Sequence, residues 1–185
     1  MDNLCLAGGV ALNCSANGLI APPIYVPPFP HDAGVALGSA WSVNPPVEQA
    51  RSISAFLGAE AGPLLELRED LSVSDTNPSR IVDLLEAGAV GAVVNGRAEV
   101  GPRALGHRSI IAIPGSVAVK DQINGVKSRE TWRPFGGVTL EKHRDLYWCA
   151  DRELSRYMIG AGTVTPCGRR DAPAVVHVDG TTRPQ

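Results

Sequence analysis

Glycine and proline are the residues that most constrain how this chain can fold. Together they account for 35 of its 185 residues, with 20 glycines and 15 prolines, well above the roughly 12% that is usual in soluble proteins. Proline lacks a backbone N–H and breaks helices, and glycine in the interior of a helix or strand lowers its stability. The sequence therefore predicts a protein in which loops carry much of the structure.

The rest of the composition is that of a globular protein. Hydrophobic residues make up 44% and charged residues 19%, which is enough apolar surface for a core and does not indicate disorder. No apolar run reaches the length of a membrane helix, and the N-terminus lacks the signals of an exported leader. We therefore expect a soluble, cytoplasmic protein with no membrane partner.

The cysteines support the same location. None of the four lies in a CxxC spacing, so a zinc site is not expected, and reduced, partly buried thiols of a cytoplasmic protein are the simplest interpretation. The cysteines are Cys5, Cys14, Cys149 and Cys167.

The first 46 residues twice repeat a strand, a turn and a helix. An apolar run ends at Gly8-Gly9, and a proline-rich loop later leads to Asp32, which can cap a following helix. The expected elements are strands over 4–7 and 24–26 and helices over 10–20 and 33–41. This pattern is typical of an α/β fold.

A second α/β unit follows residues 47–77, which show no strong periodicity and are expected to bridge two domains. Pro78 suits the first turn of a helix that ends near Gly88. The other expected elements are strands over 90–94, 110–113, 138–140 and 174–178 and a helix over 116–129. The chain begins on a strand of buried type and stops just after another, so we expect a fragment or one subunit of a split protein.

Charge is unevenly distributed along the chain. The net charge is −2, which argues against nucleic-acid binding by the chain as a whole. Residues 97–133, however, hold seven basic and three acidic side chains, a local charge of +4 against −6 for the remainder. A solvated surface normally mixes the two signs, so this segment predicts an anionic ligand.

The loop over 96–109 holds the first part of this basic segment. Its glycines can bring backbone N–H groups close to a ligand, and Arg97, Arg103 and Arg108 offer planar donors for phosphate or carboxylate. Glu99 could hold one of these arginines in place. The alternative is a surface loop with internal salt bridges.

A second basic cluster occupies residues 127–135. Lys127, Arg129 and Arg133 cannot share one helical face, but if the helix ends near Arg129, an extended segment can return Arg133 to the same site. The alternative is a basic helix end that the helix dipole favours. Two such clusters within 37 residues make an anion site the better explanation.

Three other motifs carry weaker signals. Asp32 suits a helix cap or a metal ligand, and Gly8-Gly9 before Asn13 could hold a nucleotide. His177 and Asp179 share one face of an expected strand, either as acid–base groups or as the lead into a turn. Arg183 lies just beyond and could join the cationic site.

Five segments of the chain resemble one enzyme family. GRAEVGPRALGHRSI, NGVKSRETWRPF and APAVVHVDGTTRPQ are similar to signature segments of the NodU/CmcH-type carbamoyltransferases. LAGGVALN and PPFPHDAGVALGSAW resemble the closing part of the Kae1-like, ASKHA-fold domain of the same enzymes. The resemblance covers nearly the whole chain in the same order. It implies an α/β chain in which residues 1–55 are the end of a Kae1-like domain and 56–185 a truncated YrdC-like domain.

The resemblance also implies a chemistry. Enzymes of this family join carbamoyl phosphate and ATP into carbamoyl adenylate at the YrdC-like domain. The carbamoyl group then passes to a hydroxyl or amine of a small-molecule acceptor at the Kae1-like domain, which holds nucleotide and a divalent metal such as iron or magnesium. The acceptors are often antibiotics, nodulation factors or other secondary metabolites. Positioned cations are what such phosphoryl chemistry requires.

The family positions transfer to this chain residue by residue. The resemblance implies that the catalytic cations gripping carbamoyl phosphate and the adenylate are Arg103, Lys127, Arg133 and Arg183. Supporting contacts to substrate are expected from Arg108, Ser109, Arg129 and His177. Gly8, Gly9 and Asn13 match the nucleotide-binding turn, and Asp32 matches the last metal ligand.

The chain also departs from the family pattern. Two metal-binding histidines would lie before Met1, and a loop that completes the adenylate site would lie after Gln185. The usual RPFAP reads RPFGG here. A partner chain that supplies the missing parts is therefore expected. The alternatives are a component of threonylcarbamoyl-type tRNA modification and an inactive, truncated binding subunit.

Overall fold

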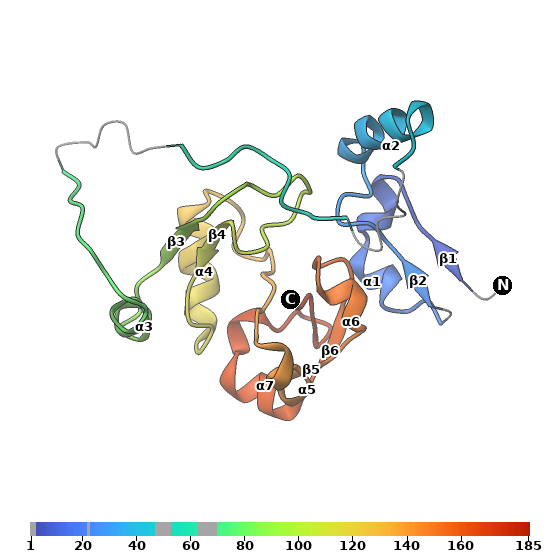
Figure 1. Ribbon diagram of the computed structural model, residues 1–185. Helices are drawn as coiled ribbons and strands as arrows, with labels where there is room; N and C mark the ends of the chain where they lie inside the picture. Colours follow the sequence, from blue (N-terminus) through green and yellow to red (C-terminus); the bar gives the residue numbers. More distant parts are fainter. Residues whose placement is uncertain (1–2, 22, 47–52, 63–69) are drawn as a thin grey trace.

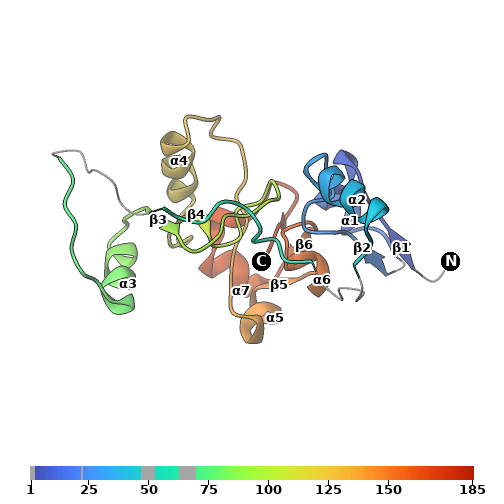
Figure 2. The ribbon, with the colours of Figure 1, turned by 45° about the horizontal axis from the view of Figure 1, so that its top comes forward.

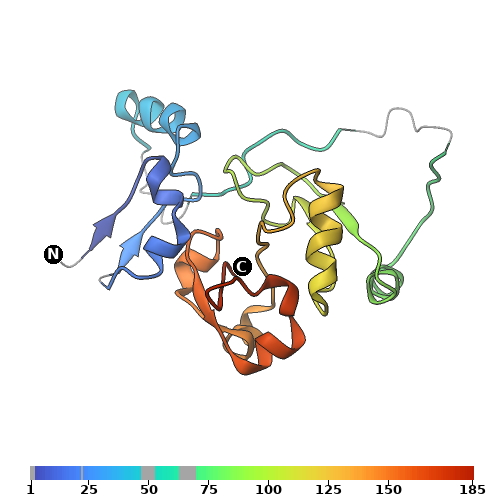
Figure 3. The same cartoon turned by 180° about the vertical axis from the view of Figure 1, so that it is seen from behind.

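The computed structural model describes residues 3–21, 23–46, 53–62 and 70–185. Figure 1 shows an N-terminal part (residues 3–46) and a middle part (78–126) at opposite ends of the molecule, with the C-terminal part (141–185) between them. The same order is visible from two other sides in Figures 2 and 3. Within the described residues, no helix is both long and apolar enough to cross a membrane.

The N-terminal part is built on two very short parallel strands. Strand β1 (Leu4–Cys5) pairs with β2 (Ile24–Tyr25), and helix α2 (Ala33–Val43) follows a proline-rich loop. Both strands and this helix fall where the sequence predicts them.

The single helix expected over 10–20 is wrong. A 3-10 turn η1 (Gly9–Leu12) comes first, and α1 (Cys14–Asn17) starts anew after Asn13. The side chain of Asn13 accepts a hydrogen bond from the N–H of Ala16 at 3.1 Å. An asparagine that caps a new helix in this way competes with continuation of the preceding one, and the sequence-based interpretation overlooked it.

The capping role expected of Asp32 is also wrong. Asp32 has helical backbone angles, and its side chain makes no capping hydrogen bond within the described part of the chain. A cap residue needs an extended backbone for its side chain to reach the N–H groups of the first turn. The carboxylate of Asp32 is therefore not used by its own helix.

The middle part is an antiparallel hairpin flanked by two helices. Helix α3 (Pro78–Glu86) is capped by Asn77, and strand β3 (Gly91–Val94) pairs with β4 (Arg108–Ile111). Helix α4 (Val117–Val126) follows the hairpin. Strand β4 starts two residues earlier than expected, because pairing with β3 continues to Arg108, directly after the glycine-rich loop.

The C-terminal part holds a three-stranded antiparallel sheet in the order β5-β6-β7. The strands are β5 (Trp148–Cys149), β6 (Gly162–Val164) and β7 (Thr181–Thr182). Its helical turns are η2 (Glu141–His143), α5 (Arg144–Tyr147), α6 (Arg152–Ser155), α7 (Pro166–Asp171) and η3 (Pro173–Val175). Across the described residues the molecule is a mixed α/β structure, so the coarse fold class is confirmed.

The strands predicted over 138–140 and 174–178 are wrong, and the sequence missed all three strands of this sheet. Pro173 initiates the 3-10 turn η3 where a strand was expected. The real strands have only two or three residues, too short for an alternating pattern to reveal. Their pairing depends on partners distant in the sequence.

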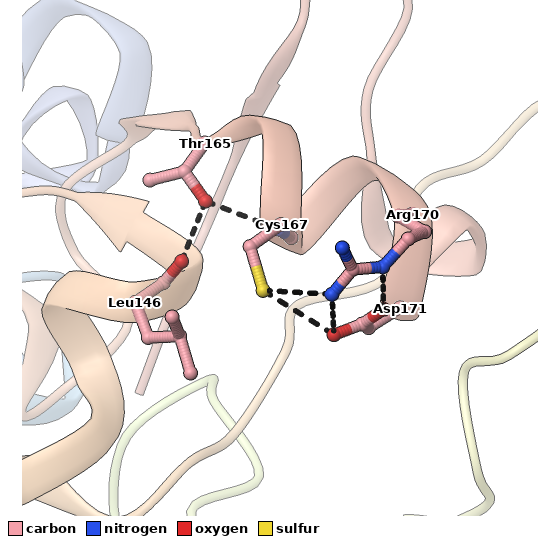
Figure 4. Close-up of polar contacts among 6 residues, drawn as sticks. Leu146, Thr165, Cys167, Arg170 and Asp171 are labelled. Carbon is pink, nitrogen blue, oxygen red and sulfur yellow. Dashed lines mark hydrogen bonds and ion pairs between the residues drawn. The ribbon is translucent and has the colours of Figure 1, made fainter.

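Helix α7 is anchored at its first turn by Thr165 (Figure 4). The hydroxyl of Thr165 accepts a hydrogen bond from the N–H of Gly168 at 3.0 Å and donates to the carbonyl of Leu146 at 2.6 Å. This cap ties the start of α7 to the end of α5 and so holds the two helices together.

Cys167 faces the ion pair at the end of the same helix (Figure 4). The guanidinium of Arg170 binds the carboxylate of Asp171 through two bonds of 2.6 and 3.0 Å, and the Cys167 thiol donates to Asp171 at 3.3 Å. That bond raises the pKa of the Cys167 thiol. All four cysteines are free, as expected, although Cys5 and Cys149 are exposed rather than partly buried.

A small apolar core joins the N-terminal and C-terminal parts. Its buried members come from both parts: Ala11, Val26, Leu154 and Ile159. The buried amide of Asn17 donates to the carbonyls of Ala11 at 2.8 Å and Ile159 at 2.9 Å. One side chain thus satisfies two carbonyls, one from each part.

Residues 53–62 run beside the hairpin loop of the middle part. Backbone bonds join Gly58 to Ala98 at 2.9 Å and Val100 to Ala55 at 2.9 Å. The proposed domain boundary at residue 55 stays a prediction. Parts of the expected bridge, 47–52 and 63–69, lie outside the described residues.

The junction at Asn17 can be tested by mutation. We expect Asn17→Ala to lower the free energy of unfolding by about 2–3 kcal/mol, because two buried carbonyls would lose their donor. Urea unfolding followed by circular dichroism measures this. Asn44→Ala, which removes an exposed side chain at the end of α2, is the control, and equal stability of both variants would contradict the assignment.

Candidate anion-binding site

The site begins at the hairpin loop between β3 and β4, which packs against the N-terminal part. A Cβ atom at Gly101 would lie 2.5 Å from the carbonyl oxygen of Pro28, so only glycine allows this approach. The contact brings Arg103 beneath η1, where its Nη2 donates to the carbonyl of Leu12 at 3.1 Å. Arg103 is thereby held between the two parts of the chain.

Glu99 stabilises this loop from inside. Its Oε1 accepts from the N–H groups of Leu105 at 2.6 Å, His107 at 3.0 Å and Arg108 at 3.3 Å. The expectation that Glu99 holds an arginine is therefore wrong, because the carboxylate closes its own loop. Burial by itself would raise the pKa of Glu99, but the backbone bonds outweigh it and lower that pKa.

The same contacts change the role of the loop. Three N–H groups of the loop, those of Leu105, His107 and Arg108, are used by Glu99. The N–H of Gly106 donates to the Ser109 hydroxyl at 2.8 Å. The loop therefore presents the side chain of Arg103 rather than a ring of N–H donors.

The guanidinium of Arg108 is fully engaged with the backbone. It donates to four carbonyls at 2.8–3.2 Å, those of Ala59, Asn95, Gly96 and His107. Arg97 likewise donates to the carbonyl of Leu57 at 2.8 Å. Both arginines attach the loop to residues 57–59. The substrate-binding roles of Arg108 and Ser109 stay predictions.

Arg129 is fixed at the end of helix α4. Its Nε donates to the amide oxygen of Asn124 at 2.5 Å, and its guanidinium lies over the ring of Phe135 at 4.2 Å. The cation–π contact and the hydrogen bond hold the guanidinium plane in one orientation.

Arg183, near the C-terminal end of the chain, lies close to Arg103 and Arg129. Two residues further on, the N–H of Gln185 donates to the carbonyl of Gly137 at 2.9 Å, and its carbonyl accepts from the N–H of Thr139 at 3.2 Å. The Gln185 side chain donates to the carbonyl of Leu105 at 3.2 Å. The last residues therefore pass between the hairpin loop and residues 136–139. Arg183 therefore lies near Arg103 and Arg129, and its catalytic role stays a prediction.

Neighbouring positive charges lower the pKa of the buried arginines. Burial lowers the pKa of Arg103, and the charge of Arg183 lowers it further. Burial also lowers the pKa of Arg129, with further lowering from Arg133 and then Arg183. Arg183 also adds to the burial that lowers the pKa of His177. Like charges in this arrangement repel one another, so an anion bound among them would stabilise all of them.

Two buried guanidinium nitrogens in this region lack hydrogen-bond partners among the described residues. The Nε atoms of Arg103 and Arg183 are buried and make no hydrogen bond to any described residue. An unpaired buried donor costs about 1–3 kcal/mol, and more when charged. A phosphate or carboxylate oxygen that accepted a hydrogen bond from either atom would remove that cost. We call the group of Arg103, Arg129, Arg133, His177 and Arg183 the arginine cluster.

His177 contributes a neutral ring to the arginine cluster. Its Nε2 lies 3.2 Å from the carbonyl of Phe135, which can only accept, and Nδ1 lies 3.3 Å from the Thr181 hydroxyl. The lowered pKa favours the singly protonated ring, and because a carbonyl can only accept, Nε2 carries that proton and donates to Phe135. The single hydroxyl proton of Thr181 goes to the carboxylate of Asp179 at 2.7 Å, so Thr181 does not serve as a donor to Nδ1. His177 therefore holds the backbone of Phe135, and an acid–base role stays a prediction.

Two predicted cations lie at the margin. Arg133 is about half exposed and pairs with Glu130 at 3.8 Å. Lys127 is exposed at the C-terminal end of α4, and its ammonium makes no hydrogen bond or ion pair to the described residues. Its catalytic role stays a prediction.

Two of the predicted nucleotide and metal residues, Gly8 and Asp32, line another cavity. A cavity of about 300 Å³ is lined by Gly8, His31 and Asp32 among others. Gly8 has a φ of +92°. A Cβ atom added at Gly8 or Gly9 would have no other heavy atom within 4 Å, so both backbones border open space. The Nδ1 atom of His31 is buried without a described partner. Asn13, however, uses its amide oxygen to cap α1.

The described residues do not contain a complete metal site. Among the described residues, no group of three His, Cys, Asp or Glu side chains could hold a metal ion. Asp32 and His31 would supply at most a portion of such a site. The assignment of Asp32 as a metal ligand therefore stays a prediction.

A larger cavity lies behind the arginine cluster. It encloses about 340 Å³ between α4, β4 and α7, and residues 135–137 form the wall that it shares with the cluster. The lining is mostly apolar, with Lys120 and Asp171 as its charged members. Its size is that of a small-molecule site.

Comparison with known proteins agrees with this arrangement. Residues 82–185 match the family model described as the carbamoyltransferase C-terminus, and residues 1–41 match the carbamoyltransferase N-terminus. The chain belongs to the carbamoyltransferase family. The resemblance predicted from the five sequence segments is confirmed, and the whole arginine cluster lies within the C-terminal match.

Several curated relatives are nodulation proteins. The chain is 39% identical to nodulation protein NolO of Bradyrhizobium diazoefficiens and 37% identical to nodulation protein NolNO of Sinorhizobium fredii, with 100% of this chain aligned to each. It is 35% identical to nodulation protein U of Rhizobium tropici over 99% of this chain. These alignments cover 38%, 30% and 33% of the relatives, so the carbamoyltransferase chain spans about a third of their length.

The hydrogen bonds that Glu99 accepts within its loop make the free energy of unfolding depend on pH. The folded-state pKa of Glu99 lies below its unfolded value, so its stabilisation is present above about pH 4.5 and is lost as the pH falls through the folded value. We expect Glu99→Gln to lower the free energy of unfolding by about 1 kcal/mol at pH 7, and by less at pH 3.5. Urea unfolding at both pH values measures this. The exposed Asp75→Asn is the control, and a pH-independent loss would contradict the assignment.

The arginine cluster should bind an anion detectably. We expect pyrophosphate to raise the melting temperature of the chain in a saturable, salt-sensitive way, and Arg183→Gln to weaken its affinity about tenfold. The same variant should raise the pKa of His177, measured by NMR, because the charge of Arg183 lowers it. Arg80→Ala, exposed on α3, should change neither; unaltered affinity in Arg183→Gln would argue against the site.

Proposed function

We propose that this carbamoyltransferase chain binds carbamoyl phosphate in the arginine cluster and takes part in its ATP-dependent conversion to carbamoyl adenylate. The observation that carries the proposal is the pair of buried, unpartnered Nε atoms of Arg103 and Arg183 on two converging segments. We assign residues 1–55 to the end of an ASKHA-type, Kae1-like domain and residues 56–185 to a YrdC-like domain. The family membership of the chain and the position of the cluster in its C-terminal match support this assignment.

In this proposal the arginines stabilise the negative charges of carbamoyl phosphate and ATP. Water hydrolyses carbamoyl phosphate to carbamate and inorganic phosphate, and a carbamate oxygen then attacks the α-phosphorus of ATP, which forms carbamoyl adenylate and releases pyrophosphate. Arg103 and Arg183 would hold the departing phosphate, and Arg129 and Arg133 would approach from the opposite segment. Fixed cations stabilise the charge that develops on such leaving groups. The cavity behind residues 135–137 offers room for the base of the nucleotide.

The second half of the reaction would use the N-terminal part. The carbamoyl group would pass to a hydroxyl or amine of a small-molecule acceptor, with Gly8 and Gly9 beside the nucleotide. Asp32 would contribute one ligand to a divalent metal, iron or magnesium, which would hold the nucleotide phosphates. A partner polypeptide is part of the proposal, because the described residues lack a complete metal site. The names of the nodulation relatives favour a specialised metabolite over tRNA as acceptor.

Pyrophosphate release from ATP tests the proposed function. We expect release that depends on carbamoyl phosphate, either from the chain alone or after addition of the N-terminal portion of a nodulation relative. Arg103→Ala and Lys127→Ala should each reduce the rate, because both remove a proposed catalytic cation. Arg80→Ala on α3 is the control.

The other outcomes separate the alternatives. Full activity in both variants would contradict the assignment of Arg103 and Lys127 as catalytic cations. No release under either condition would favour an inactive binding subunit. Salt-dependent affinity for tRNA, without turnover of carbamoyl phosphate, would favour a tRNA-modification component.

A further inference from the structure

Asn124 is a fully buried amide in the last turn of helix α4, with 0% of its surface exposed. It precedes Gly125, and neither asparagine nor glycine favours the interior of a helix. An asparagine at this position lowers the stability of the helix, so we expect its side chain to make a specific contact. The structure shows three hydrogen bonds made by this side chain.

The side-chain amide of Asn124 makes three hydrogen bonds, all to the segment 129–133. Its oxygen accepts from Nε of Arg129 at 2.5 Å. Its nitrogen donates to the carbonyls of Thr131 at 3.1 Å and Arg133 at 3.0 Å. The reversed amide would face a donor with its nitrogen and two carbonyls with its oxygen, so the orientation is unambiguous.

These contacts determine where Arg129 points. Nε is taken by Asn124, and one face of the guanidinium is taken by the ring of Phe135. The terminal nitrogens remain for a ligand, apart from a long bond of 3.4 Å from Nη2 to the carbonyl of Pro134. The same amide also fixes the backbone before Pro134, from which Arg133 extends.

We propose that Asn124 is a positioning residue of the arginine cluster, which orients the Arg129 guanidinium toward the phosphate group of the bound anion without touching the anion itself. The identity of that anion rests on the proposed function, but the positioning role rests on the contacts. A neutral amide suits this task because a carboxylate at the same place would pair with Arg129 and weaken its hold on a phosphate.

A double-mutant cycle on phosphate binding tests the proposal. Titration calorimetry with inorganic phosphate and with pyrophosphate would compare the original chain with Asn124→Leu, Arg129→Gln and the double variant. We expect Asn124→Leu to weaken binding about tenfold in the original chain and to cause no further loss in the Arg129→Gln background. Equal losses in both backgrounds would mean that Asn124 acts only on the fold, and would overturn the proposal.

Two further variants keep the test informative. Asn124→Asp retains the acceptor for Arg129 but adds a charge, and is expected to weaken phosphate binding more than Asn124→Leu does. Gln122→Ala, exposed on the same helix, is the matched control and should bind normally. If Asn124→Leu does not fold, the same cycle with the smaller Asn124→Ser is interpreted in the same way.

Failure of this proposal is distinguishable from failure of the proposed function. If the original chain binds neither phosphate nor carbamoyl phosphate, the proposed function is wrong. If it binds both, and Arg129→Gln weakens binding while Asn124→Leu does not, the positioning role of Asn124 is wrong and the proposed function is unaffected.

Discussion

The return of the last five residues into the middle of the molecule is the constraint on which the site depends. Gln185 pairs with Gly137 and Thr139 and reaches Leu105, and Pro184 is fully buried. A Cβ atom at Gly136 would lie only 2.3 Å from the carbonyl of Arg183, so the RPFGG form of this segment suits the close passage. Without that passage, Arg183 would not meet cations more than 50 residues earlier in the chain.

Two arginines of the cluster are held by neutral groups, and a third pairs with a carboxylate. Carbonyl oxygens, the amide of Asn124 and the ring of Phe135 hold Arg103 and Arg129, whereas Glu99 is used inside its own loop. Arg133 pairs with Glu130 at 3.8 Å. The neutral supports of Arg103 and Arg129 do not compensate the positive charge of these two guanidinium groups. The repulsion that remains is a cost of folding which a bound anion would offset, and this links the stability of the chain to ligand binding.

Several features were open to prediction because they depend on local chemistry. The excess of arginine in 97–133 and the return of Arg183 were found from residue types and motif order. The misassignments have physical causes of the same local kind. Asn13 starts a new helix where one continuous helix was expected, Glu99 binds N–H groups within six to nine residues, and Pro173 opens a 3-10 turn. At Asn13 and Pro173 a side chain or ring competed with the periodic pattern, and at Glu99 nearby N–H groups competed with the expected arginine partner.

The sequence by itself determined the family, the mixed α/β class and the basic segment that marks the site, because each is carried by residue identity and order. Only the tertiary structure decided which arginines are bound by backbone carbonyls and which keep an unpaired donor. Arg108 and Arg103 look alike in one loop, yet Arg108 is bound to four carbonyls while Arg103 keeps an unpaired Nε. That difference arises from where residues 59 and 12 lie in space, and a guanidinium binds whichever acceptors the fold brings within reach.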